Sequence, residues 1–418
     1  MPGHVRTRLA GVEGLRAVAA GSILVYHVWL YSAPEGHPVD LGYLSRFALP
    51  HLPSGVTLFF ALSGFLLYRP LAAGLLGGYA RPSTRTYFRN RALRIIPAYW
   101  AILAMTGLLL GAVLVRTGPD QIGTGNFLTA PRQFLMNALL LQNYSGGSID
   151  SGIGPAWSLA VELVFYLTLP VLGWLAFRAA AGSTDRARRL LSSLAPPALA
   201  LGIGWATAML LEFDTFADSL TGAIVARSFF NHADLFALGM ALAVLHVLVE
   251  RGEVHLPKLW RPVTFAGLTG VVGATVLLVD RGFILRYQGA PIYEAFTSVA
   301  CVLLLALVVL SPAPERPAGI LRILQSRALV AAGLASYSLF LWHEPIVRWL
   351  NRQGFTASGS GGFWPNLILT VAVAGLLSAV TYVVVEKPAL ARKTVRIPDA
   401  DMVARSSPVL VPSGEVQP

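Results

Sequence analysis

Apolar stretches long enough to cross a lipid bilayer recur along almost all of this 418-residue chain, and they constrain its fold more than any other feature. A span needs roughly 20 apolar residues, and its backbone polar groups must bond to one another. Hydrophobic residues make up 55% of the chain and charged residues 13%, with a mean hydropathy of +0.62. We therefore expect an all-α polytopic membrane protein. The ten predicted spans are 12–31, 55–77, 94–115, 157–178, 196–212, 233–249, 263–280, 292–311, 329–350 and 365–385.

A shorter apolar segment at 133–144 decides the predicted topology, because counting it as a span moves every later loop to the other side. If residues 133–156 are instead re-entrant or interfacial, about two thirds of the 32 Lys and Arg residues lie on the side of the N-terminus. Lys and Arg accumulate in cytoplasmic loops. We therefore predict a bundle of about ten transmembrane helices with one short re-entrant or interfacial segment. Both termini are therefore predicted to be cytoplasmic.

The net charge of +11 needs no nucleic acid partner, because loop bias and contact with anionic lipid headgroups account for it. The predicted organisation is a cytoplasmic N-terminus (1–11), a transmembrane domain (12–390) and a disordered cytoplasmic tail (391–418). Cys301 is the only cysteine, which excludes an intramolecular disulfide and favours a structural role. No His/Glu spacing predicts a metal site.

Arg16 and His27 lie inside the first predicted span, where an ionisable side chain is costly unless it has a function. Eleven residues of α-helix make about three turns, so the two side chains share one face, roughly 16 Å apart along the axis. A membrane-edge arginine or a core histidine would explain either residue alone. The presence of both residues on one face of the helix predicts an active site there.

An arginine cluster between the second and third spans predicts binding of a polyanionic cofactor such as coenzyme A. Five arginines lie within residues 81–94, and guanidinium groups bind phosphate oxygens bidentately. The alternative is that the cluster reflects only the general excess of Lys and Arg in cytoplasmic loops and their contact with lipid headgroups. Arg91 and Arg94 are the specific members, and we assign Tyr99 with them to the candidate cofactor site.

The second span adds Ser63 and Arg69 to this candidate cofactor site. Small residues in a span usually mean close helix packing, which is the favoured interpretation of Ser63 and Gly64. Arg69, near the predicted cytoplasmic end, either snorkels to the interface or helps to bind phosphate.

Glu162 is a carboxylate inside the fourth span, in the stretch that begins with Trp157. A membrane carboxylate needs a cationic or hydrogen-bonding partner, and the candidates are Arg16, His27 and His343. Bracing of the bundle by an ion pair is the alternative to a catalytic role.

Three further groups are candidates for substrate binding. Trp157 begins the fourth span, Tyr337 and His343 lie in the ninth, and His232 with Asp234 begins the sixth. Interfacial placement or helix capping would explain the same residues. Glu386, near the end of the last span, is most simply a helix terminus at the interface.

These stretches together resemble the bacterial acyltransferase-3 family of integral membrane O-acyltransferases. The match covers most of residues 8–390, and Glu13 is a departure because the family often carries Asp there. The motifs that match in order are the first-span Arg and His, FF-x-LSGFLL, the Arg-x-x-Arg of Arg91 and Arg94, WSLAVE-x-x-FY, SYSLFLWH and the terminal VEKP.

The resemblance implies a multi-pass protein of the bacterial cytoplasmic membrane. It also implies acyl transfer from cytoplasmic acyl-CoA to a hydroxyl, with Arg16 and His27 as the essential pair and Arg91 with Arg94 near the donor. We expect His27 to act as general base and Arg16 to orient the donor or stabilise the oxyanion. Glu162 is expected to hold the tautomer of His27. A covalent acyl-enzyme through His27 or Ser63 is the alternative to direct transfer.

The expected acceptor is a lipophilic natural product of macrolide or ansamycin type, or its sugar. Arg outnumbers Lys almost tenfold and Ala and Gly are abundant, which is typical of a GC-rich genome such as an actinomycete's and favours antibiotic tailoring. O-acetylation of a cell-envelope glycan is the alternative. A transporter of acylated sugars would predict an internal repeat, and none is found. A membrane scaffold would leave the buried ionisable residues unexplained.

Overall fold

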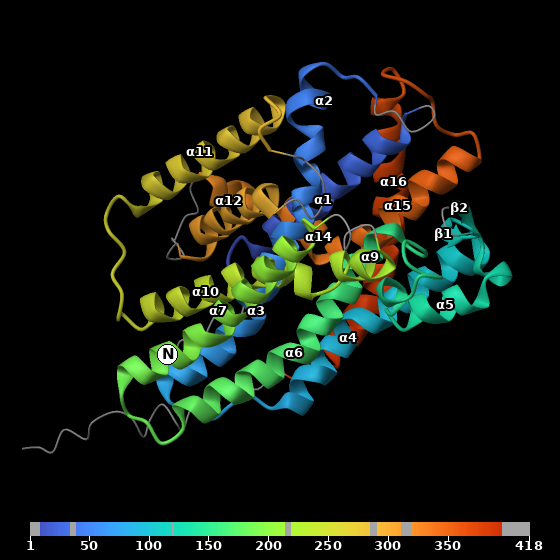
Figure 1. The fold of residues 1–418 in the computed structure, drawn as a ribbon. Coiled ribbons are helices and arrows are strands. Elements are labelled where there is room, and N and C mark those ends of the chain that lie inside the picture. Colours follow the sequence, from blue (N-terminus) through green and yellow to red (C-terminus); the bar gives the residue numbers. More distant parts are fainter. Residues whose placement is uncertain are drawn as a thin grey trace, which may run out of the picture.

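The computed structural model describes residues 9–33, 39–118, 121–213, 219–284, 291–310 and 319–394, and these form a helical bundle (Figure 1). Eight helices in this part of the chain are long and apolar enough to cross a membrane. The fold is therefore that of an all-α polytopic membrane protein, as the hydropathy predicts. The long helices of these eight spans are α3 (Gly55–Gly77), α4 (Thr84–Ala104), α6 (Trp157–Ala180), α7 (Arg186–Leu210), α10 (Ala233–Glu250), α11 (Trp260–Asp280), α12 (Pro291–Val309) and α16 (Phe363–Thr381). Two further long helices, α1 (Val12–Tyr31) and α15 (Ser336–Arg352), lie in the first and ninth predicted spans and are not among the eight.

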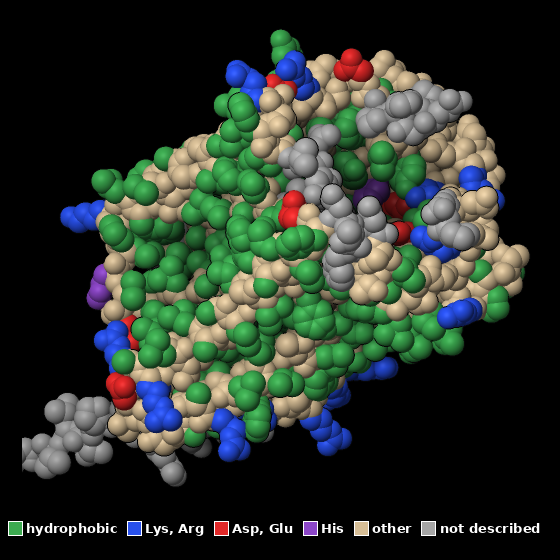
Figure 2. All heavy atoms as spheres, viewed as in Figure 1, with side chains coloured by type: hydrophobic (Ala, Val, Ile, Leu, Met, Phe, Trp, Pro, Cys, Tyr) green, Lys and Arg blue, Asp and Glu red, His purple; other side chains and the backbone are tan. Residues whose placement is uncertain are grey.

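Short elements join the long helices and cover their ends. They are α2 (Tyr43–Phe47), α5 (Pro131–Ala138), α9 (Leu220–Ala226), α13 (Ile320–Leu324), α14 (Arg327–Leu334) and α17 (Lys387–Ala391), with an antiparallel hairpin of β1 (Val113–Arg116) and β2 (Ile122–Gly125). The hairpin and α5 lie together at one edge of the bundle in Figure 1. Figure 2 shows apolar side chains spread over the flank of the bundle and a row of Lys and Arg along its lower edge.

The predicted spans differ from the helices most clearly in the third span, 94–115. The helix α4 starts earlier, at Thr84, because the arginine-rich stretch is itself helical and is capped by Ser83. It continues as a π-turn to Leu109, and the last predicted residues form strand β1 instead. In the segment 133–144 the helix α5 has only eight residues, and at about 1.5 Å per residue it is too short to cross a bilayer.

Glycines bring α3 and α10 into direct backbone contact at the centre of the bundle. A Cβ at Gly64 would lie 2.2 Å from the carbonyl oxygen of Phe236, and one at Gly239 would lie 2.1 Å from that of Ala61. The close packing expected from the small residues of the second span is therefore present. These contacts fix the α3 backbone on both sides of Ser63.

Glycine contacts with backbone also hold the first turns of the helix α1 against neighbouring segments. A Cβ at Gly14 would meet the carbonyl oxygen of Leu324 at 2.2 Å, and a Cβ at Gly333 would meet that of Glu13 at 2.0 Å. The helix also packs along α15 and α3. Because α1 is one unbroken helix, its Arg16 and His27 keep the spacing of about 16 Å that eleven helical residues impose.

Candidate active site

Two cavities lie along α1, one at each end of the Arg16–His27 face. The larger, of about 400 Å³, is lined by His27, and the smaller, of about 90 Å³, is lined by Arg16. We call them the histidine cavity and the arginine cavity. Figure 2 shows a hollow near the upper part of the molecule in which histidine and acidic side chains are visible. The two predicted key residues therefore serve different chambers.

His27 is held by a second histidine that approaches from α15. Its Nδ1 lies 2.9 Å from the carbonyl oxygen of Ile23 and 3.1 Å from Nε2 of His343. The Nδ1 of His343 lies 3.1 Å from the carbonyl oxygen of Leu339. A carbonyl only accepts, so in the neutral rings both Nδ1 atoms carry the hydrogen. His27 Nδ1–H then donates to two acceptors, the carbonyl oxygen of Ile23 and the unprotonated Nε2 of His343. The other nitrogen of His27, Nε2, is left unprotonated.

His343 is buried, with 1% of its surface exposed, and stands behind His27 without lining either cavity. The expected substrate-binding role of His343 therefore does not match its position. Its position instead makes it the residue that sets the tautomer of His27, a role we had expected for Glu162. His27 itself is half-buried and faces the histidine cavity.

A hydrogen-bonded network forms one wall of the histidine cavity next to His27. The Tyr31 hydroxyl donates to Glu344 at 2.9 Å, and the backbone N–H of Gly154 donates to the other carboxylate oxygen at 3.1 Å. Arg348 donates to both Glu344 and Tyr31 and lies over the Tyr31 ring at 4.5 Å. Both oxygens of this buried carboxylate are therefore occupied, so the network positions the wall and Glu344 is no free base.

The opposite wall carries Trp157 and His232, both expected to contact substrate, and both line this cavity. Their rings lie 5.3 Å apart, and Arg227 lies 5.6 Å from the Trp157 ring centre. Arg227 pairs with Asp150, which also lies 3.8 Å from Arg116. Burial lowers the pKa of Arg227, and the Asp150 carboxylate opposes that shift.

The arginine cavity has a different electrostatic character, because Arg16, Arg91 and Arg94 line it against a single carboxylate, Glu162. Arg16 donates to the Ser336 hydroxyl at 3.4 Å, and no salt bridge to Arg16 occurs among the described residues. Glu386 does not line the cavity but pairs with Arg94, so three guanidinium groups meet two carboxylates, and the remaining positive charge favours an anionic ligand.

Glu162 and Ser63 form a pair inside this same cavity, with the Ser63 hydroxyl donating to the carboxylate. Glu162 therefore lies with Arg16 and does not touch His27, and the expected role in holding the histidine tautomer is wrong. The oxyanion role considered for Arg16 is also excluded by distance, since three helical turns separate it from His27. Orientation of a donor is the role that fits its position.

Besides His343, three residues of the candidate set lie outside both cavities. Arg69 pairs with Glu250 of α10 at 2.7 Å on the surface of the bundle. Tyr99 is buried and donates to the carbonyl oxygen of Asn137 at 2.7 Å. Asp234 packs against α7, where a Cβ at Gly204 would meet its side chain at 2.7 Å. Each is explained by packing between helices.

Tyr337 lines the arginine cavity and not the histidine cavity, so its position does not match the expected contact with the acceptor. Its hydroxyl donates to the carbonyl oxygen of Ile95 at 3.0 Å, and Arg94 lies 5.7 Å from its ring centre. The residue therefore belongs to the wall that holds Arg94.

Two ionisable residues near the end of the chain lie in other surroundings than the sequence indicated. Glu386 is no interfacial terminus: it is 2% exposed, accepts from the Ser338 hydroxyl at 2.5 Å and pairs with Arg94 at 3.4 Å. Lys393 follows the last helix in the region predicted as a disordered tail. Burial, then repulsion by Arg91, Arg94 and Arg16, lowers the pKa of Lys393 to about 7.

The stretch that carries Lys393 is attached to α4, the helix of the arginine cluster. Asn90 exchanges two hydrogen bonds with the backbone of Thr394, each of 3.1 Å, and Arg89 donates to the Thr394 hydroxyl at 2.7 Å. The predicted tail boundary at 391 is therefore a few residues early, and residues 395–418 lie outside the described part of the chain. No local sequence signal marked Lys393, because its neighbours come from distant segments.

Comparison with known proteins identifies an acyltransferase domain, whose family profile, acyltransferase-3, matches residues 9–385. Nodulation protein 10 of Rhizobium leguminosarum bv. viciae is 28% identical over 396 residues, which cover 91% of this chain and 93% of that protein. YrhL of Bacillus subtilis, whose name proposes a peptidoglycan O-acetyltransferase, is 25% identical over 91% of this chain. The O-acetyltransferase OatA of Staphylococcus aureus is 24% identical over the same share.

The chain spans 54% of the length of YrhL and 57% of that of OatA, so the similarity to these two proteins covers little more than half of each. No solved structure matches this chain.

Proposed function

Because the chain belongs to the acyltransferase-3 family, we propose that it is an O-acyltransferase that moves an acyl group from acyl-CoA to a hydroxyl. The observation that carries this proposal is the arrangement of the two cavities. A cationic chamber and a histidine chamber open on the same face of α1, about 16 Å apart by helix geometry. Such spacing suits a donor whose phosphates stay at one end while a slender arm carries the acyl group to the other.

The donor would bind at the arginine cavity. Its volume of about 90 Å³ admits only the arm, so the phosphates and the nucleotide would remain at the cavity mouth. Arg91 and Arg94 are carried by α4, whose N-terminal turns hold further arginines, and Arg16 lies deeper. We place this end of the bundle in the cytoplasm, where loop charge predicts both termini and where acyl-CoA is available.

Chemistry would take place at His27. Its bare Nε2 takes the proton from the acceptor hydroxyl while that oxygen attacks the thioester carbonyl carbon. The carbon–sulfur bond then breaks, and His27 returns the proton to the leaving thiolate. One ester and one thiol are formed, and the histidine ends in its starting state. We favour this direct transfer over an acyl-serine, because Ser63 lies in the other cavity with Glu162.

The acceptor would enter the histidine cavity from the opposite side of the membrane. Pockets for drug-sized ligands have volumes of about 300–1,000 Å³, so this cavity, at about 400 Å³, suits one or two sugar rings better than a whole macrolide. We therefore propose a sugar hydroxyl as acceptor, on a lipophilic natural product or on an envelope glycan. The name of YrhL, which mentions peptidoglycan, favours the glycan.

The test uses the full chain purified in lipid nanodiscs with acetyl-CoA. Release of thiol is measured with simple N-acetylhexosamine oligosaccharides, with a glycosylated macrolide and with no acceptor, and the ester product is identified by mass spectrometry. Acceptor-dependent thiol release with a matching ester supports the proposal. Absence of release with every acceptor, together with transport of the same sugars across liposomes, would overturn it.

A further inference from the structure

We infer that Phe60 is the septum between the donor and acceptor chambers, and that its ring must turn aside for the arm of the donor to reach His27. This inference rests on the proposed function. It assigns to one aromatic side chain the control of when the acyl group meets the base.

The position of Phe60 is unusual in the described part of the chain, since it is the residue that lines both cavities. Its side chain is buried, with 2% of its surface exposed. The ring stacks on Phe236 with centres 4.6 Å apart, and it lies 6.3 Å from the Trp157 ring and 5.9 Å from that of His232. It therefore touches the acceptor wall while closing the end of the arginine cavity.

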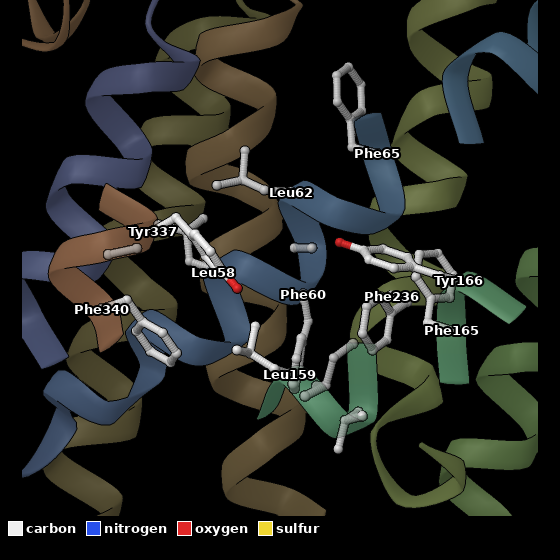
Figure 3. Close-up of a cluster of buried hydrophobic side chains, with 14 of the residues drawn as sticks. Leu58, Phe60, Leu62, Phe65, Leu159, Phe165, Tyr166, Phe236, Tyr337 and Phe340 are labelled. Atoms are coloured by element: carbon white, nitrogen blue, oxygen red, sulfur yellow. The ribbon is translucent and has the colours of Figure 1, made fainter. Parts of the chain in front are cut away.

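Figure 3 shows how this aromatic side chain stands between two groups of aromatic rings. Tyr337 and Phe340, from α15, lie to one side of Phe60, and Phe236 with Tyr166 lies to the other. Large apolar rings at the junction exclude water, as hydrophobic constrictions do in channels. In the structure the cationic chamber and the histidine chamber are thus separated by an apolar layer.

Separation has two physical consequences for an enzyme of this design. Water that entered from both membrane faces would form a path across the bilayer, and an apolar septum prevents it. Water with free access to His27 and a bound thioester would hydrolyse the donor, giving a carboxylic acid and free thiol. A septum that opens only for the arm of the donor limits both water passage across the bilayer and hydrolysis of the thioester.

The movement must be in the side chain, because the backbone of α3 has no room to shift. Gly64, one turn after Phe60, is in contact with the carbonyl of Phe236, and Gly239 of α10 is in contact with that of Ala61. The histidine cavity, of about 400 Å³, offers the ring space to turn into. Rotation of one ring would connect the chambers without displacing a helix.

The experiment compares a ligand that carries the arm with one that lacks it. Affinities of coenzyme A and of adenosine 3′,5′-bisphosphate are measured by calorimetry for the wild type and Phe60→Trp. A larger ring should weaken coenzyme A binding at least tenfold and leave the bisphosphate unchanged. Equal affinities for coenzyme A in the two proteins would overturn the septum. Failure of the wild type to bind either ligand would overturn the proposed donor instead.

A second variant opens the junction. Phe60→Ala should raise hydrolysis of acetyl-CoA without acceptor at least tenfold over wild type, and Phe60→Leu should do so to a smaller extent. Phe165→Ala is the matched control, because Phe165 is as deeply buried, stacks on Phe236 at 4.2 Å and lines neither cavity. Unchanged hydrolysis in folded Phe60→Leu, or an equal rise in Phe165→Ala, would contradict the inference.

Discussion

Nε2 of His343 lies 3.1 Å from Nδ1 of His27, so that one histidine of α15 fixes the hydrogen of another histidine on α1. Each ring also bonds to the carbonyl oxygen four residues before it, Ile23 for His27 and Leu339 for His343. The helix backbones thereby determine both tautomers. The nitrogen that faces the histidine cavity is left as a proton acceptor.

His343→Ala should lower kcat by about 10- to 100-fold with little change in the KM of the donor, because His27 loses its orienting partner while the arginine cavity is untouched. His343→Gln should recover much of the activity, since its side-chain oxygen can accept from His27 Nδ1–H. Steady-state kinetics over a range of pH would measure both effects. Equal losses in the two variants would contradict the role of His343 as the acceptor that orients His27.

Arg91→Ala should raise the KM of acyl-CoA by at least about tenfold, because a charge-assisted bond contributes about 1.5–3 kcal/mol. The KM of the acceptor should change little, since Arg91 lines the arginine cavity and does not line the histidine cavity. Arg178→Ala is the control, as this arginine lies over Trp174 away from both cavities. A larger effect on the acceptor than on the donor would place the donor elsewhere.

Titration of Lys393 should make kcat/KM for the donor fall with rising pH. Burial, followed by repulsion from Arg91, Arg94 and Arg16, lowers its pKa to about 7, so Lys393 is charged below that pH and neutral above it. If its charge attracts the phosphates, kcat/KM for the donor should fall as pH rises through about 7. Lys393→Ala should remove this fall, whereas Lys387→Ala, on the exposed surface, should keep it. A fall that persists in Lys393→Ala would contradict this assignment.

Gly154→Ala should damage the acceptor wall. A Cβ at Gly154 would lie 2.9 Å from the carboxyl carbon of Glu344, so the carboxylate must shift, and the shift disturbs its bonds to Tyr31 and Arg348. We expect a higher KM for the acceptor and unchanged affinity for coenzyme A. Gly147→Ala, where a Cβ meets nothing within 4 Å, serves as the control. Wild-type acceptor kinetics in Gly154→Ala would show that the wall tolerates the displacement.

Helix positions and the Arg16–His27 face follow from the sequence, because hydropathy and the helical repeat are local properties. In the structure Arg16, Arg91, Arg94 and Ser63 line one cavity and His27 lines the other. What the sequence does not determine is which polar group meets which across the bundle. That pairing depends on helix rotation and register, to which a hydropathy pattern is insensitive.

Glu162 and Glu386 illustrate this limit. Both are carboxylates on long apolar helices. The sequence left Arg16, His27 and His343 as candidate partners of Glu162 and placed Glu386 at the interface. Contacts of glycine with backbone set the depth of α3, and they bring Ser63 opposite Glu162. A π-turn near the end of the last span accompanies the burial of Glu386 beside Arg94 and Ser338.

The central claim is that donor binding and proton abstraction take place in different chambers. The most direct measurement uses one preparation of His27→Ala, in which coenzyme A affinity is determined by calorimetry and acetyl transfer by thiol release. Loss of a general base should lower transfer by about 10²–10⁴-fold, while coenzyme A binds as in the wild type. Full turnover in the folded variant, or loss of coenzyme A binding along with transfer, would contradict the account.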